Sequence, residues 1–212
     1  MHFTRQHLAE LLSASTQDRP GGDETAPSAA GGTSAAGGAA TAGGAATAGG
    51  LPAAVLIGLV DRAGGPTVLL TKRTEHLKDH AGQICFPGGR IEPEDTSVEA
   101  AALREAEEEI GLPPEKVDVI SRLATYDTST GFRIHPVVGW IEPPIEMTLD
   151  AFEVAEVFEL PLAFILDPAN HQRQSYQGAK ARRSYYVLPY QGRFIWGATA
   201  GMLVNFSKLL TR

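Results

Sequence analysis

The apolar positions of residues 51–212 fall into short runs that are separated by turns rich in glycine and proline. The unbroken apolar run 53–60 is typical of a buried strand. The run 67–73 follows it after the turn DRAGGP, so the two strands are expected to pair. Further strand-like stretches are found at 117–128, 132–142, 154–162, 183–190 and 193–196.

Three stretches have the apolar spacing of helices. The strongest is 96–110, the stretch 162–166 is short, and the closing stretch 199–210 carries an apolar stripe. Strands therefore dominate, with two main helices. This order predicts an α/β protein of the α+β type, in which a mixed β-sheet lies between helices.

The first fifty residues have a different composition from the rest. Residues 3–15 carry apolar side chains at roughly helical spacing, which predicts a short amphipathic helix that docks or frays. From about residue 20 to residue 50 the chain is mostly Gly, Ala, Ser and Thr, and such a composition has no large apolar side chains to offset the entropy of ordering. The predicted division is an N-terminal segment 1–19, a disordered linker 20–50 and a globular domain 51–212.

The ends of the strongest helix are marked in the sequence. Thr96 with Glu99 is typical of a capping box, and Asp95 adds negative charge where the helix dipole favours it. At the other end, Gly111 can take the left-handed position and Pro113 blocks continuation.

Three glutamates share one face of this helix. At 3.6 residues per turn, Glu105, Glu108 and Glu109 lie within an arc of about 100° near the C-terminal end, where negative charge is unfavourable. Arg104 is one turn from Glu108, but one arginine cannot neutralise three carboxylates. A solvated acidic face is the plain alternative. A bound hard cation explains the convergence better, and carboxylate oxygens suit Mg²⁺, Mn²⁺ or Ca²⁺.

The loop before the helix supports a site for a phosphate ligand. Its sequence FPGG ends in Gly88 and Gly89, which allow backbone to approach a ligand or metal closely. Mg²⁺ commonly bridges to substrate phosphates, so a glycine loop next to acidic residues favours a metal-dependent site for a phosphorylated substrate.

Charge and composition exclude several classes of protein. The net charge of −7 gives no basic field for a nucleic-acid backbone. Neither a signal peptide nor a run of about 20 apolar residues is present, so no membrane association is expected. The single cysteine, Cys85, excludes an internal disulfide and fits a reducing compartment, hence a cytoplasmic protein. Cys85 itself is interpreted as a small half-buried apolar side chain. A homodimer is left open.

The residues around the glutamates resemble the Nudix hydrolase family, whose signature is G-x5-E-x7-R-E-U-x-E-E-x-G-U, where U is a bulky apolar residue. Residues 104–112, REAEEEIGL, match its second half. The first half departs, because Asp95 stands in place of the first Glu and eight residues instead of seven separate it from Arg104.

That offset resembles the coenzyme A diphosphatase branch, which adds the upstream signature L-L-T-x-R-(S/A)-x3-R-x3-G-x3-F-P-G-G. The chain reads LLTKRTEHLKDHAGQICFPGG from Leu69 to Gly89 and keeps this spacing. Thr74 replaces Ser or Ala, and Lys78 replaces Arg, which keeps the charge but loses the planar fork for bidentate phosphate contact.

The resemblance implies a Nudix-like α/β/α sandwich with a catalytic loop-helix-loop, and it implies roles for individual residues. The metal ligands, for Mg²⁺ or Mn²⁺, would be Glu105, Glu108, Glu109 and the carbonyl of Gly89. Any one of these glutamates could instead hold the attacking water, so Glu105 and Glu108 are also catalytic candidates, with Arg104 as the residue that orients them.

Other candidates lie outside the glutamate helix. For the general base, Glu153 is preferred over Glu156 because it precedes the predicted strand. Arg73, Lys78 and Gly88 are the candidates for binding the substrate phosphates. Arg182 and Arg183, beside Tyr185 and Tyr186, are a further option for the nucleotide end by charge and stacking. His135, in an apolar strand, is interpreted as a core histidine.

The resemblance implies hydrolysis of the pyrophosphate bond of coenzyme A or an acyl-CoA to 3′,5′-ADP and a phosphopantetheine. The alternative within the family is a diphosphatase of ADP-ribose, NADH or a nucleoside triphosphate. A non-catalytic nucleotide-binding module is the alternative from another class, but such a module would be expected to have lost glutamates that this chain keeps.

Overall fold

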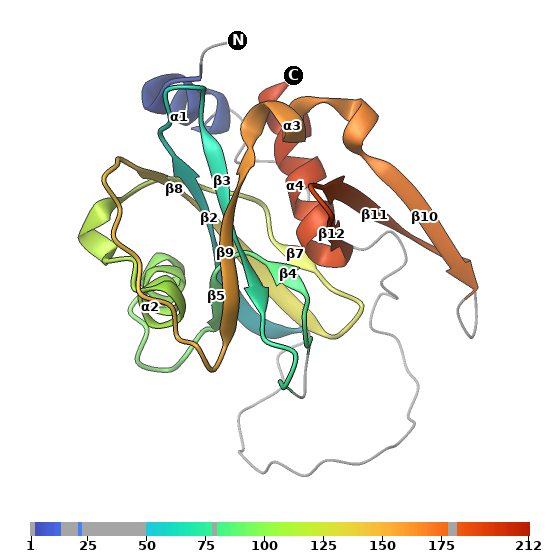
Figure 1. Ribbon diagram of the computed structural model, residues 1–212, viewed down its shortest axis with the longest axis horizontal. Helices are drawn as coiled ribbons and strands as arrows, with labels where there is room; N and C mark the ends of the chain where they lie inside the picture. The colour runs from blue at the N-terminus through green and yellow to red at the C-terminus, as the bar shows by residue number, and fades with distance from the viewer. Residues whose placement is uncertain (1–2, 14–20, 23–49, 78–79, 178–181) are drawn as a thin grey trace.

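A computed structural model describes residues 3–13, 21–22, 50–77, 80–177 and 182–212 (Figure 1). Its strands form a nine-stranded mixed sheet and a separate three-stranded antiparallel sheet. The strands of the main sheet are β1 (Gly21–Gly22), β2 (Leu51–Val60), β3 (Thr67–Arg73), β4 (Ile84–Cys85), β5 (Gly88–Arg90), β6 (Val117–Arg122), β7 (Tyr126–Asp127), β8 (Phe132–Ile141) and β9 (Val154–Pro161). The small sheet contains β10 (Gln172–Gln177), β11 (Arg182–Tyr190) and β12 (Arg193–Trp196).

The main sheet is ordered β1-β7-β8-β2-β3-β4, while β5 pairs with β2, β6 with β8 and β9 with β3. Its centre is the parallel pair β2 and β8, aligned from Leu51 opposite Phe132 to Val60 opposite Ile141. All other described strand pairs of this sheet except β1 and β7 are antiparallel.

Helices cover both faces of this sheet (Figure 1). They are α1 (Arg5–Ser13), α2 (Val98–Ile110), α3 (Leu162–Leu166) and α4 (Gly197–Leu210), with short 3₁₀ turns η1 (Pro114–Lys116) and η2 (Pro168–Asn170). α2 buries Ala102, Ala106 and Ile110 on one face, against residues such as Leu56. α1, α3 and α4 share the larger core on the other face. The predicted mixed sheet between helices is therefore confirmed.

Each strand stretch that was predicted contains a strand, and the misses have local causes. The stretch 117–128 is divided into β6 and β7. β4 and β5 lie where a glycine loop was expected. β10 has the sequence QRQSYQ, which offers no apolar pattern, and it forms because β11 supplies backbone partners from Gln172 to Gln177.

The helix predicted within residues 3–15 is α1, and it is docked. Leu8 is fully buried and Leu12 almost so, both in the core shared with α4. Arg5 forms an ion pair with Asp118 of β6. Of the predicted linker, the structure describes β1, which pairs with β7, and Gly50; the rest lies outside the described residues, so the division at residues 19 and 50 stays a prediction.

The start of α2 corrects the predicted capping box. Ser97, not Thr96, is the N-cap, because Ser97 has extended backbone angles and its hydroxyl accepts a hydrogen bond of 3.1 Å from the N–H of Ala100. The predicted end is confirmed: Gly111 is left-handed with a φ of 64°. A side chain there would also collide with the backbone of Thr148, 2.8 Å away.

None of the described helices is long and apolar enough to cross a membrane.

Candidate active site

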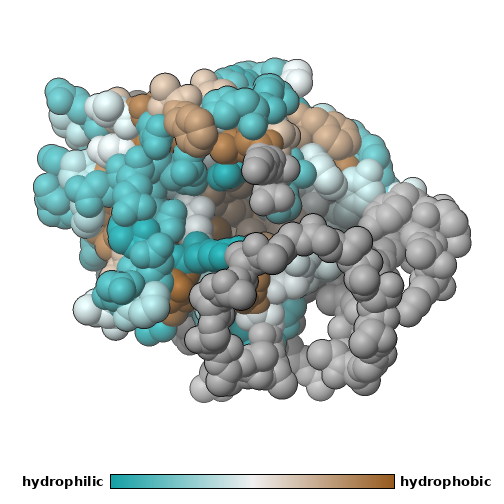
Figure 2. All heavy atoms as spheres, turned by 90° about the horizontal axis from the view of Figure 1, so that it is seen from below, coloured by the Kyte–Doolittle hydropathy of each residue, from teal (hydrophilic) through white to brown (hydrophobic). Residues whose placement is uncertain are grey.

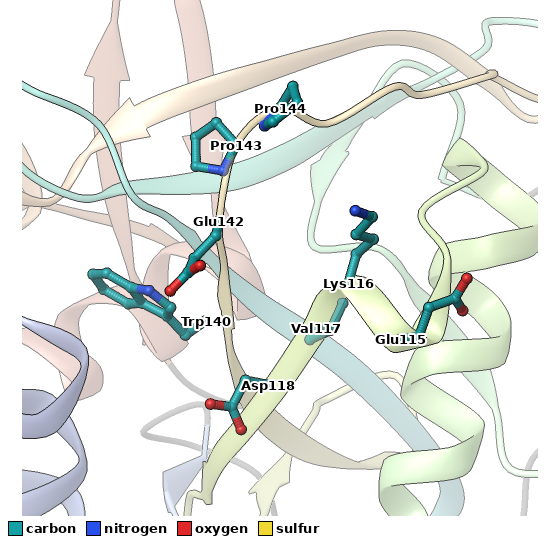
Figure 3. Close-up of a pocket in the computed structure, with 8 residues that line it drawn as sticks. All are labelled: Glu115, Lys116, Val117, Asp118, Trp140, Glu142, Pro143 and Pro144. Atoms are coloured by element: carbon teal, nitrogen blue, oxygen red, sulfur yellow. The ribbon is translucent and has the colours of Figure 1, made fainter.

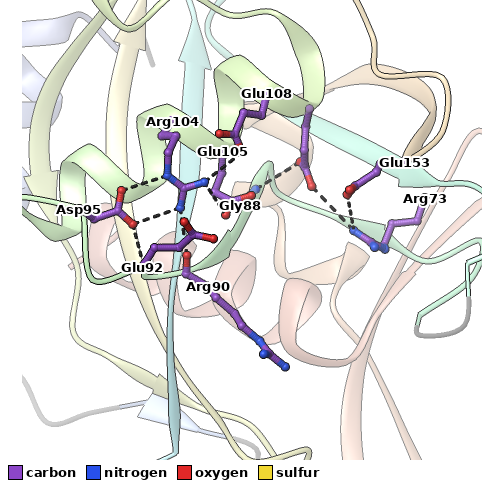
Figure 4. A network of polar contacts seen from close by, with 10 residues as sticks. Arg73, Gly88, Arg90, Glu92, Asp95, Arg104, Glu105, Glu108 and Glu153 are labelled. Carbon is purple, nitrogen blue, oxygen red and sulfur yellow. Dashed lines mark hydrogen bonds and ion pairs between the residues drawn. The ribbon is translucent and has the colours of Figure 1, made fainter. Parts of the chain in front are cut away.

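Arg104 is the centre of a polar network at the start and middle of α2 (Figure 4). Its Nε and Nη2 donate to the two carboxylate oxygens of Asp95 at 3.0 and 3.1 Å. Nη1 donates to Glu108 at 3.0 Å and lies 3.1 Å from Glu105, and Nη2 also donates to the carbonyl of Arg90 at 3.2 Å. Arg104 thus fixes the loop, the helix start and two of the three glutamates together.

Asp95 is a functional residue whose main role the sequence did not reveal. In addition to its two contacts with Arg104, Asp95 accepts a hydrogen bond of 2.8 Å from the N–H of Glu92. This bond holds the loop between Glu92 and Asp95 together. These contacts, with that of Arg104 the stronger, hold the pKa of Asp95 below its ordinary value. The five residues between Gly89 and Asp95 were the available signal, since they place Asp95 where the signature has its first glutamate.

Gly89 and Gly88 are approached closely on two sides, and the backbone of β2 makes a side chain at Gly88 impossible without a shift. A Cβ on Gly89 would lie 2.5 Å from the carboxylate of Glu105. Gly88 has a φ of 154°, and a Cβ there would lie 2.4 Å from the carbonyl oxygen of Ala54. β5 therefore runs with bare backbone between strand β2 and the carboxylates of α2, as the loop sequence predicted.

Glu109 is the buried member of the three glutamates, with 4% of its surface exposed. The N–H of Gly88 donates to it at 3.3 Å, and Nη1 of Arg73 lies 3.7 Å away. Burial raises the pKa of Glu109 to about 8, and the charges of Glu105 and Glu153 add to this, although Gly88 and Arg73 oppose it. A carboxylate in this state gains from any further cation that enters the site.

Arg73 connects this buried carboxylate to the preferred general base. Its Nη1 lies 4.0 Å from Glu153 as well as 3.7 Å from Glu109, and its Nε is buried without a hydrogen-bond partner among the described residues. The backbone of Glu153 is held because its carbonyl accepts a hydrogen bond of 3.0 Å from the N–H of Thr74. The charge of Glu153 raises the pKa of both Glu105 and Glu109, so the three acids face one another.

The donor set fits a hard divalent cation. In the described part of the chain, no three acidic, His or Cys side chains are grouped as a ready metal site. Instead, Arg104 and Arg73 draw the carboxylates apart (Figure 4). The fit lies in the chemistry: oxygen ligands on one helix face, the bare backbone of Gly89 against Glu105, and the under-neutralised Glu109.

The structure separates the remaining candidates. Glu156 is turned to the other side, where it pairs with Arg193, so it does not join Glu153. Half-burial, with the charges of two arginines, lowers the pKa of His135, which fits a neutral histidine in the sheet. Burial raises the pKa of Cys85 to about 11, so its thiol is not a nucleophile. Lys78 lies outside the described residues, and for Arg182 and Arg183 only the strand β11 is described.

A pocket of about 580 Å³ lies elsewhere, beside η1 and the end of β8 (Figure 3). Glu115, Asp118 and Glu142 line it with Trp140. Trp140 is paired with Leu59 in the sheet, whereas Gly88 is paired with Val55, so the pocket is displaced along β2 from the glutamates of α2. Figure 2 shows the lower side of the molecule, where hydrophilic residues cover most of the described surface.

Comparisons with known proteins give a consistent result. The NUDIX domain model matches residues 50–173. A protein named "Uncharacterized Nudix hydrolase NudL" from Escherichia coli O7:K1 is 46% identical over 152 residues, which cover 71% of this chain and 78% of the relative. Its namesake from Enterobacter sp. (strain 638) is 44% identical over 151 residues, with the same shares.

Among solved structures, the Nudix hydrolase RenU of M. smegmatis is 25% identical, with a TM-score of 0.43 over 54% of this chain and 73% of that one. A C. elegans Ap4A hydrolase in a binary complex is 20% identical, with a TM-score of 0.45 over 52% of this chain and 80% of that one.

Proposed function

The chain belongs to the Nudix hydrolase family, and we propose that its substrate is coenzyme A or an acyl-CoA, which it splits into 3′,5′-ADP and a phosphopantetheine. The general activity is that of the family, hydrolysis of the pyrophosphate bond of nucleoside diphosphate derivatives. What we propose for this chain is the substrate within this class.

One observation supports the coenzyme A assignment above others. The second signature runs from Leu69 to Gly89 with unchanged spacing, and its arginine, Arg73, has its guanidinium 3.7 Å from Glu109 and 4.0 Å from Glu153. This contact supports a role for the signature beyond the fold. Nη1 of Arg73 holds its two carboxylates at long distance, which leaves the guanidinium able to bind a substrate phosphate oxygen.

In the proposed reaction, Glu105, Glu108, Glu109 and the carbonyl of Gly89 would hold Mg²⁺ or Mn²⁺, which when bound would supply charge neutralisation and Lewis-acid polarisation. Glu153 accepts a proton from the water whose oxygen attacks phosphorus, while the bridging P–O bond breaks and its electrons leave with the departing phosphate. The N–H of Gly88 and the guanidinium of Arg73 bind phosphate oxygens, and Arg104 keeps Glu105 and Glu108 in place. Lys78, which lies outside the described residues, stays a candidate for contact with a substrate phosphate.

The same proposal includes a cytoplasmic location, where the reduced Cys85 and the substrate would both be found, and it leaves a homodimer open.

The test compares substrates. Purified protein is incubated with CoA, 3′-dephospho-CoA, ADP-ribose or NADH in Mg²⁺ or Mn²⁺, and the products are identified by mass. CoA carries a 3′-phosphate that the other three compounds lack, and one charge-assisted contact to it is worth about 10- to 100-fold in kcat/KM. We expect CoA to be preferred by that factor over 3′-dephospho-CoA. Equal rates on these two, with faster turnover of ADP-ribose, would leave only the general family activity.

A further inference from the structure

Phe152 is the most exposed of the large apolar side chains in the described residues, with 64% of its surface open. Exposed apolar residues are common, so exposure alone carries no function. Phe152, however, is the direct neighbour of Glu153, the proposed general base.

The backbone of Phe152 is held rigidly. Its carbonyl accepts a hydrogen bond of 2.7 Å from the hydroxyl of Thr74, and its N–H donates to the carboxylate of Asp150 at 2.8 Å. The N–H of Asp150 in turn donates to the carbonyl of Glu109 at 3.0 Å. The loop that carries Phe152 is therefore tied both to the end of α2 and to the end of β3, next to Arg73. The backbone of Phe152 is therefore fixed relative to that of Glu109 and Thr74.

The ring itself rests against one partner. The ring of His76 lies 4.7 Å from that of Phe152, centre to centre, at an angle of 58°. His76 is itself exposed and comes from the loop that follows Arg73. Because the rings are tilted, His76 supports Phe152 and still leaves part of its surface to solvent. An immobilised, open aromatic surface thus stands at the edge of a site that is otherwise built from charges.

We propose that Phe152, supported by His76, stacks on the purine base of the nucleotide whose pyrophosphate lies at Glu153 and Arg73. This inference rests on the proposed function and names the part of the substrate that the edge of the site recognises. A flat base gains from a preordered aromatic surface, whereas the flexible pantetheine arm would have to be ordered first. Phe152 is then a specificity residue, and His76 is a positioning residue that acts through it.

The experiment measures binding, not turnover, with two ligands that differ only by the base. Dissociation constants of adenosine 5′-monophosphate and ribose 5-phosphate are measured calorimetrically for the full chain and for Phe152→Ala. Loss of one base–aromatic stack predicts roughly tenfold weaker binding of the nucleotide and no change for ribose 5-phosphate. Phe152→Tyr should bind like the wild type. His76→Ala should lose part of the effect, and His76→Phe should restore it.

Phe194→Ala is the matched control, because Phe194 is a comparably exposed phenylalanine, 49%, on β12 of the small sheet. It should change neither constant, and thermal melting shows that each variant is folded. The inference is overturned if Phe152→Ala leaves nucleotide binding unchanged or weakens both ligands equally. If CoA is not hydrolysed but the nucleotide-specific loss is found, the proposed function fails and the base contact stands. Hydrolysis of CoA without that loss means that the proposed function stands and the base contact fails.

Discussion

Arg104 and Arg73 lie on either side of one cluster of carboxylates, yet their surroundings differ in kind (Figure 4). Arg104 has contacts of 3.0–3.2 Å to three carboxylates and a carbonyl, and its interactions with Asp95 and Glu105 raise its pKa further. Arg73 reaches its two carboxylates only at 3.7 and 4.0 Å, and its Nε lacks a partner in the described chain.

The difference separates two tasks that an arginine can perform in one site. A guanidinium with its donors saturated at short distance cannot take a new ligand without breaking bonds, so Arg104 serves to hold geometry. A partly exposed guanidinium that contacts its carboxylates only at long distance can also bind a phosphate. The half of the site around Arg73 is therefore the side where we expect substrate and metal to enter.

The largest effect is expected from a change at Glu109, the carboxylate beside Arg73. Glu109→Gln keeps the shape of the side chain and removes its charge. Loss of residues that only support metal ligands typically costs 10- to 100-fold, so loss of a ligand should lower kcat by more than about 100-fold with the fold retained. Steady-state kinetics under limiting Mg²⁺ measure this, and circular dichroism controls for folding. Wild-type turnover in the variant would remove Glu109 from the mechanism.

Arg73→Gln should come next. Removing one charge-assisted contact to phosphate is expected to cost about 10- to 100-fold in kcat/KM for CoA, mainly through KM. Arg62→Gln is the matched control, because Arg62 pairs with Glu159, which is not one of the proposed site residues. A fall in kcat alone would mean that Arg73 acts on the carboxylates and not on the substrate.

Arg104→Lys tests the arginine whose donors are all engaged. Lysine keeps the charge but cannot form the two-point contact to Asp95, so we expect about a tenfold loss in kcat with little change in KM. Asp95→Asn should show a similar loss, and the double variant should be little worse than either single one, because both remove the same contact. Additive losses would indicate that the two residues act separately.

The smallest effect concerns stability without metal. The pKa of Glu109 is raised from 4.5 to about 8 on folding, so the folded state holds a proton that the unfolded state releases. The contribution of this group is complete below the unfolded pKa and is lost as pH rises to about 8. In chelator, Tm of the wild type should therefore fall by a few degrees relative to Glu109→Gln between about pH 5 and pH 8. Calorimetry at both pH values measures this difference; a constant difference would contradict the raised pKa.

How far the sequence predicts this site depends on the range of each contact. Local spacing predicted α2 to within two residues at its start, the pairing of Arg104 with Glu108, and the close backbone approach at Gly88 and Gly89. It treated the three glutamates as equivalent, whereas Glu109 is buried and Glu108 is exposed. That difference arises from the strands and loop packed on the helix, which helical spacing does not contain.

The approach of Glu153 to Arg73 was likewise beyond local pattern. It follows from the pairing of β3 with β9, which places Val154 opposite Arg73 across a shift in register. An irregularity of this kind has no sequence signal that distinguishes it from a regular pair. Glu153 was preferred over Glu156 only because it precedes a strand, and the shift in register is the physical reason that it lies near the carboxylates.

The docking of α1 has a consequence for how the chain folds during its synthesis. Leu8 and Leu12 share a core with Leu203 and Phe206 of α4, so a helix that leaves the ribosome early packs on one that is made much later. Contacts between such distant parts of a chain form late, because the loop between them must close first. During synthesis, α1 therefore waits with its apolar side uncovered until α4 has been made. Docking of α1 on α4 would then be a late step in folding. In a nascent chain that stops short of α4, the apolar side of α1 would stay exposed, and the chain would aggregate or bind chaperones.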